Sequence, residues 1–178
     1  ADPTGAVAGF ADATGRFLPL VCTSNAAKVL DAVARLLGVD HDEFDRLALA
    51  AVGDTDVPVL LPYLDGERTP NRPNATGLIG GLRSDVTREQ FALAAVNGVA
   101  CGLLDALDAL RDHAAVTGRV VLTGGGARSS ALRSVLAGLI GQPLVLASVD
   151  QAVAAGAAVQ AAAVAGGVDH ATVQQRWG

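Results

Sequence analysis

The chain has 178 residues, a length that suits one domain, and 51% of them are hydrophobic, enough to bury a sizeable core. With 13 Lys and Arg against 18 Asp and Glu, the net charge is -5. This balance argues against nucleic acid and anionic membrane surfaces as partners, because both attract basic patches. Neither a signal peptide nor about 20 uninterrupted apolar residues can be seen, so we expect no membrane span; region 152–168 comes closest.

The residue types with reactive or metal-binding side chains are sparse. Cys22 and Cys101 are too few and too far apart for a disulfide framework, and we expect both to be buried as small hydrophobic side chains. His41, His113 and His170 have no metal-ligand spacing and are expected at solvated helix ends. The sequence contains no methionine, so its first residue is not an unprocessed start.

The N-terminal elements are a hairpin and a helix. Residues 7–22 show two short apolar runs around a turn sequence, which predicts the hairpin. Thr23, Ser24 or Asn25 can supply the N-cap of the helix, and Gly38 stands where a helix in this pattern ends.

A second short helix, a strand and a loop follow. Asp40 can cap the helix. The mostly apolar run 57–64 predicts a strand buried on both faces, and 65–74 reads as an irregular loop. In this loop Glu67 and Arg68 could form an ion pair that rigidifies it, make a hinge or interlobe contact, or make a contact between subunits.

The longest helix is predicted from Thr87 to about residue 114. Thr87 and Gln90 have the spacing of a capping box, and apolar residues then recur at helical spacing. Gly98 and Gly102 inside this helix each cost about 1 kcal/mol relative to alanine. That cost suggests that another segment approaches the helix closely there.

The last third of the chain alternates between strands and helices. The expected elements are a strand at 119–123, a helix capped by Ser129 or Ser130, a strand at 144–147, and an Ala-rich helix capped by Ser148 or Asp150. This alternation indicates parallel strands joined by right-handed crossovers. The predicted fold class is α/β, with a mixed sheet flanked by helices on both faces.

The strongest functional signal is a glycine-rich junction between a strand and a helix at 124–129. Glycines let a ligand approach the backbone, and the N–H groups and dipole of the following helix favour an anion or a ring edge. Ligands of open α/β sheets also bind at the carboxyl ends of strands. These arguments predict a nucleotide site; the alternative is a tight turn without a ligand.

The residues alone leave the kind of nucleotide open. No Walker sequence is present. Gly124 and Gly126 fit a dinucleotide fingerprint, although Ser129 replaces its third glycine, and Asp150 lies near the place of a ribose-binding acid. A dinucleotide-binding module of an oxidoreductase is therefore one reading of this segment.

Several stretches resemble the C-terminal domain of the FGGY carbohydrate kinases. Residues 61–70 are similar to the loop that marks the xylulokinase branch, and 77–82 with 90–96 resemble the C-terminal signature of the family. Residues 124–129 resemble its adenosine-binding turn and 154–158 its last core helix. The resemblance implies a ribonuclease H-like lobe of the actin/hexokinase ATPase type.

On this resemblance, the whole chain is the C-terminal nucleotide-binding lobe of a sugar kinase. Gly125, Gly126 and Ser129 would line the adenosine pocket of the ATP site, and Gly124 and Ala127 would shape the turn. The reaction would be phosphorylation of a ketose, D-xylulose to xylulose 5-phosphate, by ATP carried with Mg²⁺. A cytoplasmic location and a homodimer are further expectations.

In the family, the catalytic aspartate, the sugar pocket and the first strands of this lobe precede the part that the chain resembles. We therefore expect no catalytic, sugar-binding or metal-binding residue in this chain, and no phosphorylation by this chain alone. A non-catalytic module that only pairs subunits is the remaining alternative.

Overall fold

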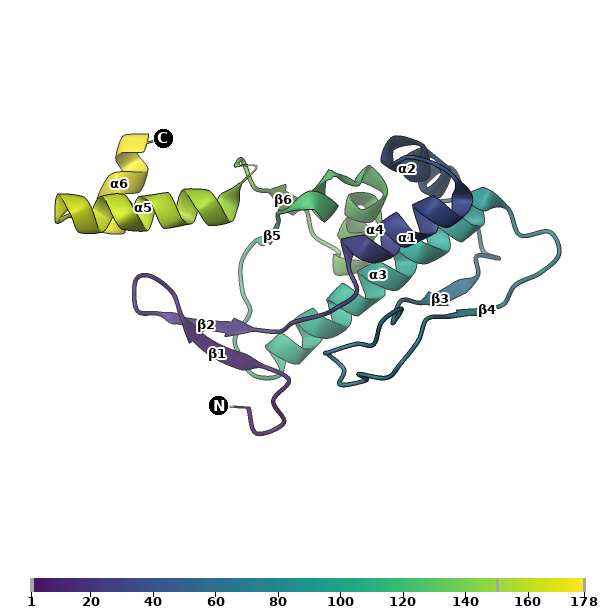
Figure 1. The fold of residues 1–178 in the computed structure, drawn as a ribbon, viewed down its shortest axis with the longest axis horizontal. Helices are drawn as coiled ribbons and strands as arrows, with labels where there is room; N and C mark the ends of the chain where they lie inside the picture. The colour runs from purple at the N-terminus through teal and green to yellow at the C-terminus, as the bar shows by residue number, and fades with distance from the viewer. Residues whose placement is uncertain (1, 150, 178) are drawn as a thin grey trace.

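The structure is a computed structural model that describes residues 2–149 and 151–177. Strands and helices alternate irregularly along it (Figure 1). In chain order they are β1 (Ala8–Ala11), β2 (Phe17–Leu20), α1 (Ala27–Leu37), α2 (His41–Ala50), β3 (Val59–Leu61), β4 (Leu78–Gly80), α3 (Arg88–Arg111), β5 (Val120–Leu122), the 3-10 turn η1 (Gly125–Arg128), α4 (Ser130–Ile140), β6 (Leu144–Leu146), α5 (Ala152–Gly166) and α6 (His170–Trp177).

The core is built around α3, which α1, α2 and α4 contact on one side and β3 on another. The predicted capping box is confirmed: Thr87 Oγ1 accepts from Gln90 N, and Gln90 Oε1 accepts from Thr87 N, both at 3.2 Å. Most of the buried side chains of α3 lie between Ala92 and Ala100. Its first half is thus the part that the other helices enclose.

The helix ends follow local signals in most cases. Gly38 and Gly141 close α1 and α4 in the left-handed conformation, with φ of 69° and 70°. Asp40 caps α2, as predicted, by accepting from Glu43 N. The predicted cap of α1 is wrong: its N-cap is Ala26, without a side-chain bond.

Among the described residues the strands form three separate two-stranded sheets. β1 and β2 form the predicted hairpin, and β5 and β6 pair in parallel with Val120 opposite Leu144. β3 pairs antiparallel with β4, a strand that the sequence did not reveal because its region contains three glycines, which are poor strand formers. The prediction that 57–64 is buried on both faces is wrong: in β3 only Leu60 is buried.

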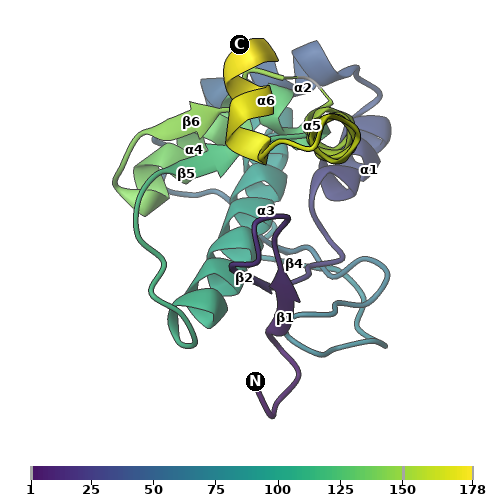
Figure 2. The ribbon, with the colours of Figure 1, turned by 90° about the vertical axis from the view of Figure 1, so that its left-hand side faces the viewer.

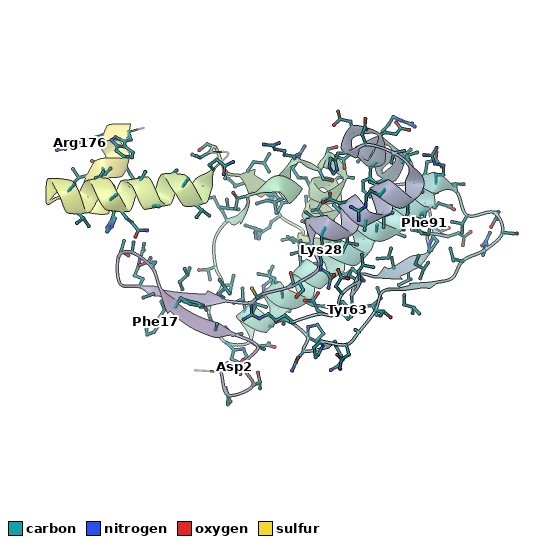
Figure 3. The ribbon with its side chains drawn as sticks, in the orientation of Figure 1. Asp2, Phe17, Lys28, Tyr63, Phe91 and Arg176 are labelled. Atoms are coloured by element: carbon teal, nitrogen blue, oxygen red, sulfur yellow. The ribbon has the colours of Figure 1, made fainter. Side chains whose placement is uncertain are left out.

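Large apolar side chains are exposed on β1–β2 and on α5. Phe17 is 95% exposed and points away from the hairpin (Figure 3). α5 stands apart from the α1–α4 group (Figure 1) and packs against α6, which lies beside it in Figure 2. It is apolar all round, yet Val153 is 90% exposed and only Ala163 is buried. Since helices that are apolar on every side are normally enclosed, these faces are suited to pack against further polypeptide.

In the described part of the chain, α3 is the one helix that is by itself long enough and apolar enough to cross a membrane. α5 and α6 pass the same test only when they are taken together as one broken span, bent by 115°. The sequence had pointed to 152–168 instead. The buried residues of α3 show it to be a core helix. Both cysteines are free, but Cys22 is only half-buried and Cys101 is exposed, so the prediction that both are buried is wrong.

Candidate functional site

The glycine turn, residues 124–129, connects β5 to α4 through η1. Gly124 has φ of 85° and ψ of -173°, a conformation that is essentially restricted to glycine. Gly125 and Gly126 do not have positive φ. A Cβ on Gly125 would meet no atom within 4 Å, so the backbone of the turn is open to a neighbouring molecule there. Gly124 is therefore required for the backbone conformation of the turn, whereas Gly125 leaves the backbone accessible.

This difference predicts that Gly124→Ala lowers the free energy of unfolding by about 1–3 kcal/mol, the usual cost of a side chain in such a conformation. Gly125→Ala is the matched control, because its added methyl group meets open space. Urea denaturation of both variants measures the effect. An equal loss in the two variants would contradict the assigned backbone role of Gly124.

A cleft of about 480 Å³ lies between the glycine turn, α1 and α2. Its volume is within the range of about 300–1,000 Å³ that is common for small-molecule sites. The lining residues are Gly125, Gly126, Arg128 and Ser129 from the turn, Ala27, Leu30 and Asp31 from α1, and His41, Asp42, Phe44 and Asp45 from α2. Of the five predicted site residues, Gly125, Gly126 and Ser129 line the cleft, while Gly124 and Ala127 are in the turn but not among the lining residues.

The start of α4 is fastened to α2 by Asp45. Its carboxylate accepts from Ser129 Oγ at 2.6 Å, from Ser130 Oγ at 2.9 Å and from Ser130 N. Ser129 Oγ in turn accepts from Leu132 N at 3.1 Å and is the N-cap of α4, as predicted. Protein oxygens therefore already bind the N–H groups of Ser130 and Leu132 at this helix start.

The side chain of Arg133 on α4 also forms hydrogen bonds to the turn. Arg133 donates to the carbonyl oxygens of Ala127 and Arg128, at 2.7 and 2.9 Å. On the α1 side, a Cβ placed on Gly126 would lie 3.7 Å from the Ala27 side chain, an ordinary packing distance. Hydrogen bonds thus hold the glycine turn from two sides, through Asp45 on α2 and through Arg133 on α4.

Sequence reasoning missed the part of the cleft that α1 and α2 provide. Asp45 and Ser129 are 84 positions apart, and nothing in the local pattern of α2 marks Asp45 as different from a solvated charge. His41 is exposed at the first position of α2, as predicted, and it also lines the cleft, with Nδ1 3.7 Å from Asp31 Oδ1.

A second polar cluster fastens the loop after β3 to the chain before α1. The Glu67 carboxylate accepts from Ser24 N, from Asn25 Nδ2 at 2.9 Å and from Arg68 N at 2.7 Å. Glu67 is 4% exposed and Asn25 2% exposed. Burial raises the pKa of Glu67, but these hydrogen bonds lower it by more, so its pKa lies below the usual range.

This cluster bears on the three roles considered for Glu67 and Arg68. The two side chains form no ion pair within the described part of the chain; Arg68 is exposed, and Glu67 binds N–H groups instead. Asn25 also donates to Gly66 O at 2.7 Å, and Lys28 on α1 lies 3.2 Å from Asp65 (Figure 3). The loop is therefore held to the start of α1, whose first residue lines the cleft.

Comparison with known proteins identifies the family. Residues 2–165 match the model of the FGGY family of carbohydrate kinases, C-terminal domain. The chain belongs to this family. It is 47% identical to the xylulose kinase of Streptomyces coelicolor over 99% of the chain and 35% of that protein, and 33% identical to the xylulose kinase of Haemophilus influenzae over 87% and 32%. The chain thus spans about a third of the length of these relatives.

Solved structures agree with the sequence matches. The crystal structure of xylulose kinase from Bifidobacterium adolescentis has a TM-score of 0.80 at 47% identity, over 93% of this chain and 33% of that one. A ligand-bound xylulose kinase from Lactobacillus acidophilus has a TM-score of 0.83 at 24% identity, over 98% and 36%, which bears on the fold alone. The predicted FGGY kinase resemblance and its fold class are confirmed.

Membership of a kinase family decides against a dinucleotide-binding module. The geometry of the turn argues the same way, because dinucleotide folds place a pyrophosphate at the helix start that Asp45 contacts here. Asp150, the proposed ribose-binding acid and a possible cap of α5, lies outside the described residues.

Proposed function

We propose that this chain supplies the adenosine-binding face of an ATP-dependent sugar kinase that phosphorylates a ketose, D-xylulose. The observation that carries the proposal is the match to the C-terminal domain of the FGGY kinases, with 47% identity to a xylulose kinase over 99% of the chain. D-Xylulose is proposed over other sugars because two Streptomyces xylulose kinases are 47% and 46% identical over 99% of the chain, whereas the glycerol kinase of Rhodopirellula baltica is 34% identical over 79%. Residues 1–178 together would form the nucleotide-binding lobe.

The charge of the cleft supports binding of the nucleoside end of ATP. Asp31, Asp42 and Asp45 line it with Arg128 as the one guanidinium among the lining residues. A surplus of carboxylates repels phosphate groups, whereas the amino group of adenine and the hydroxyls of ribose can donate to carboxylates. Adenosine would therefore lie against Gly125, Gly126 and Ser129, with its phosphates directed out of the cleft.

The remaining parts of the reaction are proposed to come from outside these residues. Within 2–149 and 151–177, His, Cys, Asp and Glu side chains form no group of three that could hold a metal ion. Mg²⁺ would instead arrive with ATP and offset the charge of its phosphates during transfer of the γ-phosphoryl group. A catalytic base and a sugar pocket are assigned to no residue here. Because the substrates are ATP and a free sugar, we propose a cytoplasmic location.

Titration calorimetry of the 178-residue chain with Mg-ADP tests the proposal. We expect binding that Gly125→Val weakens about tenfold or more, about 1.4 kcal/mol, because the added side chain meets no protein atom at its Cβ and would extend into the cleft. Gly102→Ala, which adds a methyl group in open space on α3, is the control and should bind like the wild type.

The alternatives give different results in the same experiment. Tighter binding of NAD⁺ than of Mg-ADP would favour the dinucleotide module. Self-association without nucleotide affinity would favour the subunit-pairing module. Equal Mg-ADP affinity in the wild type and in Gly125→Val would place the nucleotide elsewhere on the chain.

A further inference from the structure

Asp45 is the one residue of α2 whose side chain is bonded to the glycine turn. It makes three hydrogen bonds across 84 and 85 positions of sequence, to Ser129 and Ser130. These two residues follow directly on η1, so the carboxylate fixes the end of the turn relative to α2. The other carboxylate of α2 in the cleft, Asp42, has no hydrogen bond to the turn within the described residues.

The hydrogen bonds of Asp45 connect two of the walls of the cleft. α2 provides one wall, and Gly125 and Gly126 belong to another. Arg133 ties the turn to α4 but does not reach α2, so it can hold the shape of the turn without setting its distance from α2. Asp45 is the direct hydrogen-bonded link between these walls in the described part of the chain.

The same carboxylate also changes what the start of α4 can bind. Helix starts attract anions because their N–H groups are unpaired and the dipole is positive there. Asp45 accepts from Ser130 N and from both hydroxyls, so it occupies these donors and supplies the negative charge itself. A phosphate group would meet a carboxylate at this place instead of a row of donors.

We infer that Asp45 is a positioning residue of the nucleotide cleft, which holds the glycine turn at the spacing that a nucleoside fits and keeps anions away from the start of α4. The inference rests on the proposed function, since it assigns Asp45 to the orientation of ATP in the same cleft. It goes beyond the proposed function because it names one carboxylate, distant in sequence from the turn, that decides whether the nucleoside or the phosphate end of the nucleotide enters the cleft.

The test uses the 178-residue chain and two probes in titration calorimetry, Mg-ADP and inorganic pyrophosphate. Asp45→Ala should weaken Mg-ADP binding about tenfold or more. It should also gain measurable pyrophosphate binding, because Ser130 N and two hydroxyls become available. Asp45→Asn keeps one acceptor oxygen and should recover part of the Mg-ADP affinity. Asp169→Ala removes the carboxylate that binds Thr172 at the start of α6, away from the cleft, and should leave both titrations unchanged.

Circular dichroism and thermal unfolding establish that each variant is folded. A folded Asp45→Ala variant that binds Mg-ADP like the wild type would overturn the inference and leave the proposed function standing. Weaker Mg-ADP binding with no pyrophosphate binding and no recovery in Asp45→Asn would indicate only a general loss of structure, which also overturns it. A wild type that binds no Mg-ADP would overturn the proposed function and this inference together.

Discussion

Replacing Gly98 by alanine is expected to lower the free energy of unfolding by about 3 kcal/mol, the upper part of the range for an overpacked core. A Cβ on Gly98 would overlap with the carbonyl oxygen of Leu60 on β3. Because that atom belongs to the backbone of a buried strand residue, it cannot move aside as a side chain can. Either α3 or β3 must shift, and the packing of both would loosen.

Gly102 provides the matched control, one turn further along the same helix. No atom lies within 4 Å of the place its Cβ would take, so Gly102→Ala adds only helix propensity and should stabilise the chain by about 1 kcal/mol. Urea denaturation of the wild type and both variants at neutral pH measures the two effects. Similar midpoints for Gly98→Ala and Gly102→Ala would contradict the close contact of α3 with β3.

These two glycines illustrate what the sequence could reveal. Both carry the same propensity cost, and the sequence predicted a close approach at each; the structure confirms it at Gly98 and contradicts it at Gly102. A local cost marks a glycine that calls for an explanation, but whether glycine is required there depends on a partner strand that is distant in sequence. Features that a few neighbouring residues determine, such as the capping box at Thr87 and the helix end at Gly38, were predicted correctly.

The candidate site also has one part that the sequence predicted and one part that it did not. The glycine turn is continuous in sequence, and three of the residues predicted from it line the cleft. The facing wall comes from α2, where Asp45 lies beside the buried Phe44 and looks like an ordinary residue at the edge of an amphipathic helix. Its role appears only when α2 and α4 are brought together, because hydrogen bonds between helices leave no periodic signal in either one.

Removal of the Glu67 carboxylate is the other change with a large expected effect. Glu67→Ala should lower the free energy of unfolding by about 3–5 kcal/mol at neutral pH, because in a buried place Ser24 N would lose its acceptor and the Asn25 amide would lose one of its two acceptors. Asn25 already has a buried Oδ1 without a partner among the described residues, so it has little freedom to find another arrangement. Glu67→Gln keeps one acceptor oxygen and should lose less.

The comparison of wild type with Glu67→Gln also has an expected dependence on pH. The pKa of Glu67 in the folded chain lies below its ordinary value of 4.5. The extra stability of the wild type should therefore be fully present above about pH 5 and be lost as the pH falls below 4.5 and through the folded pKa, where the carboxylate is protonated in both states.

Urea denaturation of both proteins between pH 7 and pH 3 would measure this difference, with Glu43→Gln as the control. Glu43 is also a carboxylate with a lowered pKa, but it pairs with Arg46 on the exposed side of α2, so its replacement should change stability little at any pH. A stability difference between wild type and Glu67→Gln that stays constant to pH 3 would mean that the charge of Glu67 is not what binds the loop to the start of α1. In that case packing alone would hold this side of the cleft.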